Sequence, residues 1–178
     1  MTEGSLASAR LLVFRVGTLA CAADVDQVRE ILPRLPTTRI PGAPPVVAGL
    51  VNVRGTLVTV VEGWRALGLP PLSPTPSPEA GTTTGSTIIL ELGKAEDAAN
   101  GGQQGHGGTG GGAGAGAKLI GFTVDEVVDM LAGGETTLED RQGLPGIDPI
   151  LVRAVGRRDG ELFIVLDVAA LLGPILTS

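Results

Sequence analysis

The chain has 178 residues, of which 43% are hydrophobic and 2% aromatic, enough for one domain or two small lobes around an aliphatic core. A net charge of −6, with 13 scattered Lys and Arg residues, excludes the clustered basic surface of a nucleic-acid-binding protein. The single cysteine excludes an intrachain disulfide. Because the sequence has neither a signal peptide nor the apolar run of about 18 residues that a membrane helix needs, we expect a cytoplasmic protein.

The N-terminal segment predicts a β-hairpin followed by a helical turn. Apolar runs at 10–16 and 19–23 are separated by a glycine-led pair, a pattern typical of two paired strands. Asp24, with a glutamine three residues later, indicates a capped helical turn over 25–28. An apolar face is expected to continue from this turn through Val28, Ile31 and Leu32.

The next segment predicts an extended connection and a second pair of strands. Five prolines in 33–45 exclude a helix there. Two runs rich in β-branched residues, 50–53 and 56–61, flank Arg54-Gly55 and predict either a hairpin or one long bulged strand. A short helix is predicted over 64–69 because the apolar pattern there ends at a proline.

Two stretches of low complexity interrupt the second half. Residues 72–85 are mostly Pro, Ser, Thr and Gly, which predicts a linker. Residues 94–117 are dominated by glycine and carry no apolar run, which predicts a disordered insertion. Between and after them, 87–92 and 118–124 are predicted strands, and the apolar pattern continues over 125–131.

The C-terminal segment predicts another hairpin. After a turn-rich connection over 138–150, strands are expected at 151–158 and 161–168, joined by Asp159-Gly160. A short helix over 168–172 is predicted, capped by the aspartate before it. In all, eight to ten short strands with turns between them favour small all-β barrels over a parallel α/β sheet.

Few residues are candidates for chemistry. The run Gly105–Gly110 matches G-x-G-x-x-G but lacks the strand before it and the helix after it that nucleotide binding needs, and it contains the single histidine, His106. Cys21 lies in an apolar strand without a basic neighbour, as expected of a buried structural thiol. Asp125-Glu126 is expected to cap a strand end and Trp64 to pack against a lobe. We therefore predict no catalytic residues, no metal site and no cofactor.

Four stretches together resemble the CheW family of chemotaxis coupling proteins. The most specific is GLVNVRGTLV at 49–58, which resembles the family signature G-[VI]-[IV]-N-[LI]-R-G-x-[VI]-[LI]. The other three are VREIL with its Pro-rich continuation at 28–44, IGFTVDEV at 120–127 and GELFIVLDV at 160–168. The resemblance covers residues 10–172, with the linker and the insertion inside it. It implies two five-stranded SH3-like β-barrel lobes around a shared hydrophobic core, with short helices.

The resemblance also implies a function. CheW proteins are non-enzymatic scaffolds that couple the cytoplasmic tip of a chemoreceptor to the regulatory domain of the CheA histidine kinase, at receptor arrays on the inner face of the membrane. No nucleic acid or membrane insertion is implied. The positions that match the family's partner-binding residues are Val28, Glu30, Gly49, Asn52, Arg54 and Gly55.

These positions also have structural interpretations. Glycine at 55 is expected to supply a backbone conformation that a side chain disfavours, and Asn52 to hydrogen-bond the turn backbone. Glu30 and Arg54 are alternatively expected to pair with each other in a surface ion pair. Two apolar neighbours are expected in the core, Ile31 and Val53.

Two features depart from the family pattern, and three alternatives stay open. The family commonly has Asp-Leu where this chain has Glu62-Gly63, so the following helix is expected to start differently. The glycine-rich insertion replaces a short connection, at a loop-closure cost that grows only logarithmically with length.

The alternatives are an adaptor in a non-chemotaxis receptor–kinase cascade, a nucleotide-binding enzyme that uses the glycine-rich loop, and a purely structural barrel.

Overall fold

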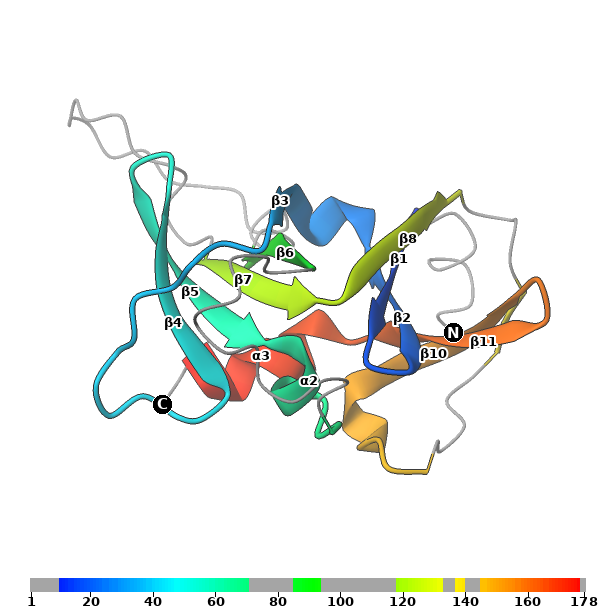
Figure 1. Cartoon of the computed structure of the whole chain (residues 1–178). Helices are drawn as coiled ribbons and strands as arrows, with labels where there is room; N and C mark the ends of the chain where they lie inside the picture. The colour runs from blue at the N-terminus through cyan, green and yellow to red at the C-terminus, as the bar shows by residue number, and fades with distance from the viewer. Residues whose placement is uncertain (1–9, 71–84, 94–117, 133–136, 140–144, 177–178) are drawn as a thin grey trace, which may run out of the picture.

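The computed structural model describes residues 10–70, 85–93, 118–132, 137–139 and 145–176, which form two β-sheets with short helices (Figure 1). The predicted linker, except for its last residue, and the whole predicted insertion lie outside these residues, and so does His106. No helix within the described part of the chain is long and apolar enough to cross a membrane.

The first sheet, lobe 1, is assembled from both ends of the chain. Its described strands follow the order β8-β1-β2-β11-β10-β9. Neighbours pair antiparallel except β2 and β11, which run parallel. The bounds of these strands are β1 Leu11–Val16, β2 Leu19–Asp24, β8 Glu126–Leu131, β9 Thr137–Glu139, β10 Val152–Arg158 and β11 Glu161–Leu166.

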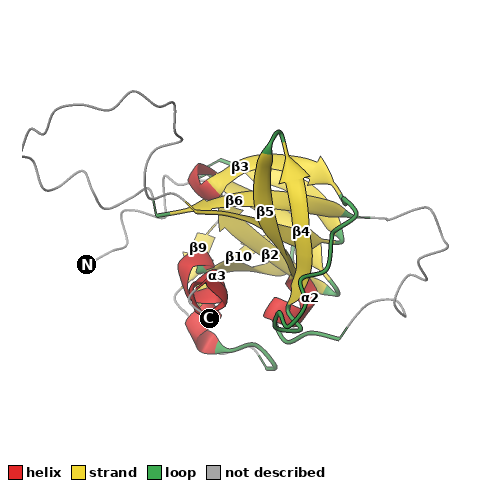
Figure 2. Cartoon of the chain, turned by 90° about the vertical axis from the view of Figure 1, so that its left-hand side faces the viewer, coloured by secondary structure: helices red, strands yellow, loops and turns green. Residues whose placement is uncertain are grey.

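The second sheet, lobe 2, is formed by the middle of the chain. Its described strands follow the order β3-β6-β7-β5-β4, with β5 and β7 parallel and the other neighbours antiparallel. Figure 2 shows this lobe end-on, with helices below its strands. The bounds of the strands are β3 Val28–Pro33, β4 Val47–Val53, β5 Thr56–Glu62, β6 Ser86–Leu92 and β7 Lys118–Val124.

Short helices follow or precede the strands. Three of them, η1, η3 and α3, begin after an aspartate whose carboxylate accepts a backbone N–H. The caps of η1 by Asp24 and of α3 by Asp167 were predicted. The helix α3 extends four residues beyond the predicted 168–172. The bounds are η1 Val25–Gln27, α2 Gly63–Ala66, η3 Pro149–Leu151 and α3 Val168–Leu176.

Three groups of buried side chains hold the lobes together. Each barrel has its own interior, one around Phe163 in lobe 1 and one around Val51 in lobe 2. The largest group lies between the lobes, where Phe14 of β1 and Phe122 of β7 meet edge to face with ring centroids 6.0 Å apart. The predicted two-lobed β fold around a shared core is thus confirmed, and β9 gives lobe 1 a sixth short strand.

Local sequence signals placed the hairpins correctly, and tertiary context overrode two other predictions. The apolar residues that follow η1 belong to a strand, β3, and not to a continued helical face. Ile31 was expected in the core but is 42% exposed, because side chains alternate between the two faces of β3 and its neighbours Glu30 and Leu32 occupy the partly buried face. Val53, by contrast, is partly buried against the interior of lobe 2.

Candidate partner-binding surface

The tip of the β4–β5 hairpin presents an arginine on a well-defined turn. Arg54 has φ 51° and Gly55 has φ 85°, the positive values that a two-residue hairpin turn of type I′ requires at both central positions. The Asn52 side-chain oxygen accepts a hydrogen bond from the Gly55 backbone N–H at 2.8 Å. Both structural predictions for Asn52 and Gly55 are therefore confirmed, and their effect is to fix the position of the Arg54 backbone.

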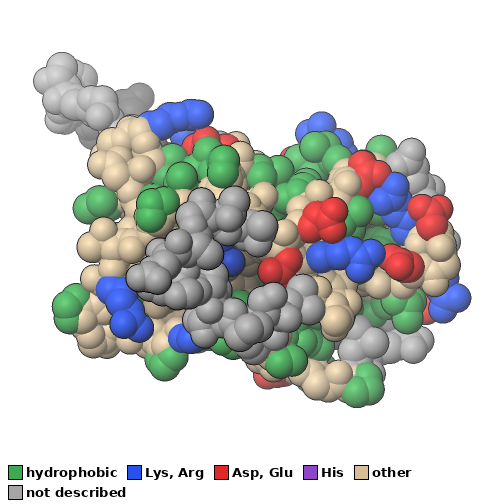
Figure 3. All heavy atoms as spheres, in the orientation of Figure 1, with side chains coloured by type: hydrophobic (Ala, Val, Ile, Leu, Met, Phe, Trp, Pro, Cys, Tyr) green, Lys and Arg blue, Asp and Glu red, His purple; other side chains and the backbone are tan. Residues whose placement is uncertain are grey.

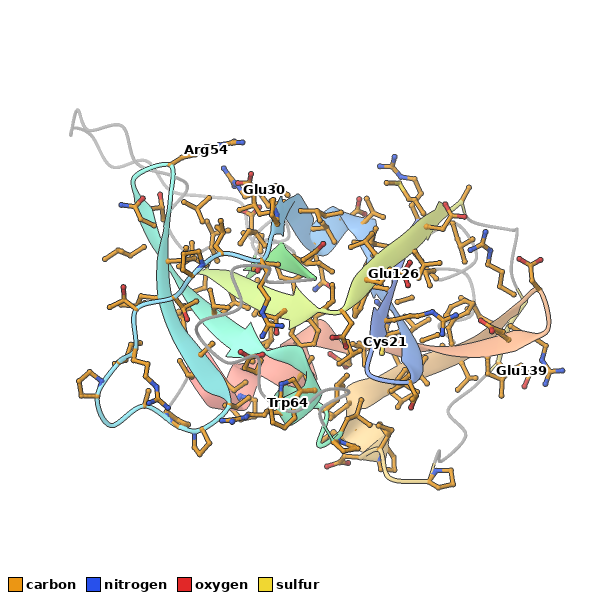
Figure 4. The ribbon with its side chains drawn as sticks, in the orientation of Figure 1. Cys21, Glu30, Arg54, Trp64, Glu126 and Glu139 are labelled. Carbon is orange, nitrogen blue, oxygen red and sulfur yellow. The ribbon has the colours of Figure 1, made fainter. Side chains whose placement is uncertain are left out.

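Arg54 reaches across to the other edge of lobe 2. Its Nη2 lies 3.2 Å from Oε2 of Glu30 on β3 (Figure 4). The Arg54 side chain is 82% exposed, whereas that of Glu30 is 20% exposed. The expected pairing is confirmed, but an ion pair with one partner this exposed contributes only about 0–1 kcal/mol to stability. The guanidinium is thus oriented by Glu30 while most of its surface faces solvent.

Gly49 is required by the backbone around it. It is buried, with φ 152°, and an added Cβ would lie 2.3 Å from the Thr38 carbonyl oxygen. Thr38 and Leu50 form a backbone bridge there, with two N–H···O bonds of 2.8 Å. The glycine therefore allows the segment before β4 to cover that edge strand. Val28 is half-buried and packs against the shared core.

An exposed leucine beside this turn was not among the predicted site residues. Leu57 is opposite Asn52 in the β4–β5 register, so the two side chains point to the same outer face. Leu57 is 68% exposed. The alternation along β5, with Val58 buried and Leu57 outside, was the available signal. We call Glu30, Asn52, Arg54, Gly55 and Leu57 together the lobe 2 tip.

The face that includes this region is chemically mixed. In Figure 3, hydrophobic side chains gather over lobe 2 beside basic and acidic ones. Surfaces that combine exposed aliphatic groups with an oriented arginine are suited to contact another protein. Among the described residues, no group of three or more His, Cys, Asp or Glu side chains is placed to hold a metal ion.

The remaining candidates for chemistry have structural roles. Cys21 is fully buried, and burial raises the pKa of its thiol to about 12, so it is a poor nucleophile. Trp64 packs against the shared core, with the Arg65 guanidinium 4.7 Å from its ring centroid. Asp125 accepts a 2.6 Å hydrogen bond from the Gly17 N–H at a strand end. These observations confirm the structural interpretations of the cysteine, the tryptophan and the aspartate.

A polar network explains the departure at Glu62-Gly63. The Glu62 carboxylate accepts bonds from Arg34 at 2.8 and 3.0 Å and from the Thr123 hydroxyl at 3.0 Å. The same hydroxyl accepts the Gly63 N–H at 3.1 Å and so caps the start of α2 from β7. A Cβ at position 63 would lie 2.1 Å from the Thr123 carbonyl oxygen. The helix therefore begins at Gly63, against a neighbouring strand that leaves no room for leucine.

Comparisons with known proteins agree with this architecture. A family model described as "CheW-like domain" matches residues 10–174. The chain is 22% identical over 173 residues to a Bacillus subtilis protein named "Chemotaxis protein CheW", covering 97% of this chain and 92% of that protein. It is 37% identical over 65 residues to a Rhizobium meliloti protein of the same name, a match that spans 36% of this chain and only 42% of that relative.

A solved structure shows the same fold. The scaffolding protein TtCheW from Thermoanaerobacter tengcongensis superimposes with a TM-score of 0.67 at 18% sequence identity. The match covers 97% of this chain and 92% of that structure. Both lobes of the present chain are therefore included in the similarity.

Proposed function

This chain belongs to the CheW-like domain family, and on that basis we propose that it is a non-enzymatic scaffold in chemotaxis signalling. It would couple the cytoplasmic tip of a chemoreceptor to the regulatory domain of a CheA-type histidine kinase, and it would act at receptor arrays on the inner face of the membrane. The observation that supports this most is the lobe 2 tip, where the turn fixes the backbone of an exposed arginine and its guanidinium lies 3.2 Å from the Glu30 carboxylate.

The geometry of the tip suits specific, reversible docking. A guanidinium that is already oriented loses less conformational freedom on binding than a mobile one. Leu57 supplies apolar area beside it, and its burial by a partner would contribute about 1.5–3 kcal/mol. The charge at position 54 then selects the orientation of the partner more than it adds affinity.

The other matched positions support this surface in different ways. Glu30 orients Arg54, Asn52 and Gly55 shape the turn, and Gly49 keeps the edge strand β4 in place. Val28 packs at the start of β3, the strand that carries Glu30. We therefore assign direct partner contact to Arg54, and to the other five positions the support of its geometry.

A scaffold of this kind acts by holding two partners at once. One bound partner raises the effective concentration of the other, so modest individual affinities suffice. Each contact would bury on the order of 1,000 Å², as in weak or transient interfaces. Signalling would follow from arrangements of the kinase that the scaffold contacts differently in the active and inactive states.

Titration of the kinase regulatory domain by calorimetry tests the assignment. Arg54→Ala should weaken binding at least about tenfold, a change of 1.4 kcal/mol, while its melting temperature stays within about 3 °C of wild type. Arg153→Ala, which removes an exposed arginine on β10 of lobe 1, is the matched control and should bind as wild type does. Equal affinities for wild type and Arg54→Ala would show that the contact lies elsewhere.

A further inference from the structure

Within the described part of the chain, the backbone passes between the lobes at two short crossovers. The first runs from β2 through η1 to β3, and the second runs from β7 to β8 through a single residue, Asp125. Figure 1 shows β7 continuing into β8 from one lobe to the other. The angle between the lobes therefore depends on how these two crossovers are held.

Both crossovers are hydrogen-bonded to the ends of strand β1. Just before β1 begins, the Arg10 carbonyl oxygen accepts the Val25 N–H of η1 at 2.9 Å. Near its other end, the Arg15 carbonyl oxygen accepts the Asp125 N–H, also at 2.9 Å. Strand β1 thus anchors both crossovers to lobe 1 through main-chain atoms.

The side chain of Asp125 adds a bond at the second crossover. Its Oδ2 accepts the Gly17 N–H at 2.6 Å, in the turn between β1 and β2. A hydrogen bond to a carboxylate is shorter and stronger than one between neutral groups. The carboxylate therefore ties this crossover to the β1–β2 hairpin more firmly than the main-chain bond does by itself.

On its other side, the same crossover is held by lobe 2. The Thr123 hydroxyl, two residues earlier, donates to Glu62 at 3.0 Å. Gly85 lies so close that an added Cβ would be 2.7 Å from the Val124 carbonyl oxygen and 3.8 Å from the Asp125 Cα. Bonds to lobe 2 thus end, and bonds to lobe 1 begin, within one short stretch of backbone.

The apolar core between the lobes adds stability without fixing a direction in the same way. It is built from hydrophobic side chains, with Phe14 against Phe122, and hydrophobic burial is non-directional. Ion pairs such as Arg158–Asp129 join strands of the same lobe. Directional control of the angle therefore falls to the hydrogen bonds at the crossovers.

We propose that Asp125 is a positioning residue whose bond to the Gly17 N–H fixes the angle between the lobes. Without the carboxylate, each lobe keeps its own strands and interior, but the lobes sample a wider range of angles. The consequence for signalling rests on the proposed function. A scaffold with a variable angle still binds each partner, but it presents one partner to the other in many orientations, which lowers their effective concentration.

Distances between two spin labels on the chain alone test the proposal without any partner. The labels are attached at Thr56→Cys in lobe 2 and Arg153→Cys in lobe 1, both exposed positions, whereas the native Cys21 is fully buried and stays unlabelled. Dilution with unlabelled protein restricts the pulsed EPR measurement to distances within one molecule. Adding Asp125→Ala should widen the distance distribution about twofold or more, because more lobe angles are populated.

Two controls show whether the widening comes from this bond. Asp125→Asn keeps an acceptor oxygen and should keep the narrow distribution. The Asp148 carboxylate also accepts a backbone N–H, that of Ile150 at 3.1 Å, but both residues belong to the turn before β10, so Asp148→Ala should change nothing. Thermal melts show that each variant is folded. A folded Asp125→Ala chain with the wild-type distribution, or an equal widening in either control, would overturn the proposal.

The consequence for the scaffold is measured separately. In Asp125→Ala, the affinities for a receptor-tip fragment alone and for the kinase regulatory domain alone should stay within about twofold of wild type, while retention of the kinase domain on immobilised receptor should fall about fivefold or more. Loss of either single affinity would make Asp125 a contact residue and contradict the positioning role. If wild type binds neither partner, the proposed function fails, and the label distances still decide whether Asp125 fixes the angle.

Discussion

Substitution of Gly49 by alanine should destabilise the fold strongly. The added Cβ would lie 2.3 Å from the Thr38 carbonyl oxygen, at a φ of 152° that side-chain-bearing residues rarely adopt. A strained backbone of this kind costs about 1–3 kcal/mol, and shifting the Thr38 carbonyl weakens a backbone bridge whose hydrogen bonds contribute about 1 kcal/mol each. We therefore expect a loss of about 3 kcal/mol, or roughly 10 °C in melting temperature.

Gly55→Ala is the matched control for this prediction. Gly55 also has a positive φ, 85°, but an added Cβ there meets nothing within 4 Å. Only the conformational cost of about 1 kcal/mol applies. Calorimetric melts of both variants give the comparison. If Gly49→Ala melts no lower than Gly55→Ala, the close approach to Thr38 is not what position 49 requires, and a direct role in partner contact regains support.

Two further predictions concern buried groups. Thr123→Val removes the hydroxyl that accepts the Gly63 N–H and donates to Glu62. The free energy of unfolding, measured by chemical denaturation, should therefore fall by about 1–3 kcal/mol. Thr56→Val, a control at an exposed position, should change it by less than about 0.5 kcal/mol. Burial raises the pKa of the Cys21 thiol from 9.0 to about 12 in the folded state, so above pH 9 the thiol ionises in the unfolded state first. Between pH 9 and pH 12, the free energy of unfolding of wild type should therefore fall by about 1.4 kcal/mol per pH unit relative to that of Cys21→Ala. Parallel pH curves for those two proteins would mean that the thiol is accessible in the folded state.

Features set by adjacent residues could be predicted from the sequence. The hairpins at 17–18, 54–55 and 159–160 follow from residue pairs that contain a glycine, which permits positive φ. The caps of η1 and α3 follow from an aspartate before an apolar turn. The Glu30–Arg54 ion pair was also anticipated, as the alternative to a role of these two charges in partner contact.

Features set by the order of strands could not be predicted. The exposure of Ile31 and that of Leu57 depend on which face of β3 and of β5 points outward, and the assembly of the strands decides this. The composition of lobe 1 was equally hidden, because it combines strands from both ends of the chain. The network of Arg34, Glu62 and Thr123 joins three segments distant in sequence, so no local pattern indicates it.

Whether this chain bridges a receptor and a kinase is best tested by capture of the kinase. A receptor cytoplasmic-tip fragment is immobilised, and retention of the kinase regulatory domain is measured while the concentration of this chain is raised. A bridging scaffold predicts no retention without the chain, a maximum at intermediate concentration, and a decline in excess, when each partner is occupied by a separate copy. Retention that is independent of the chain, or absent at every concentration, would contradict the proposed function.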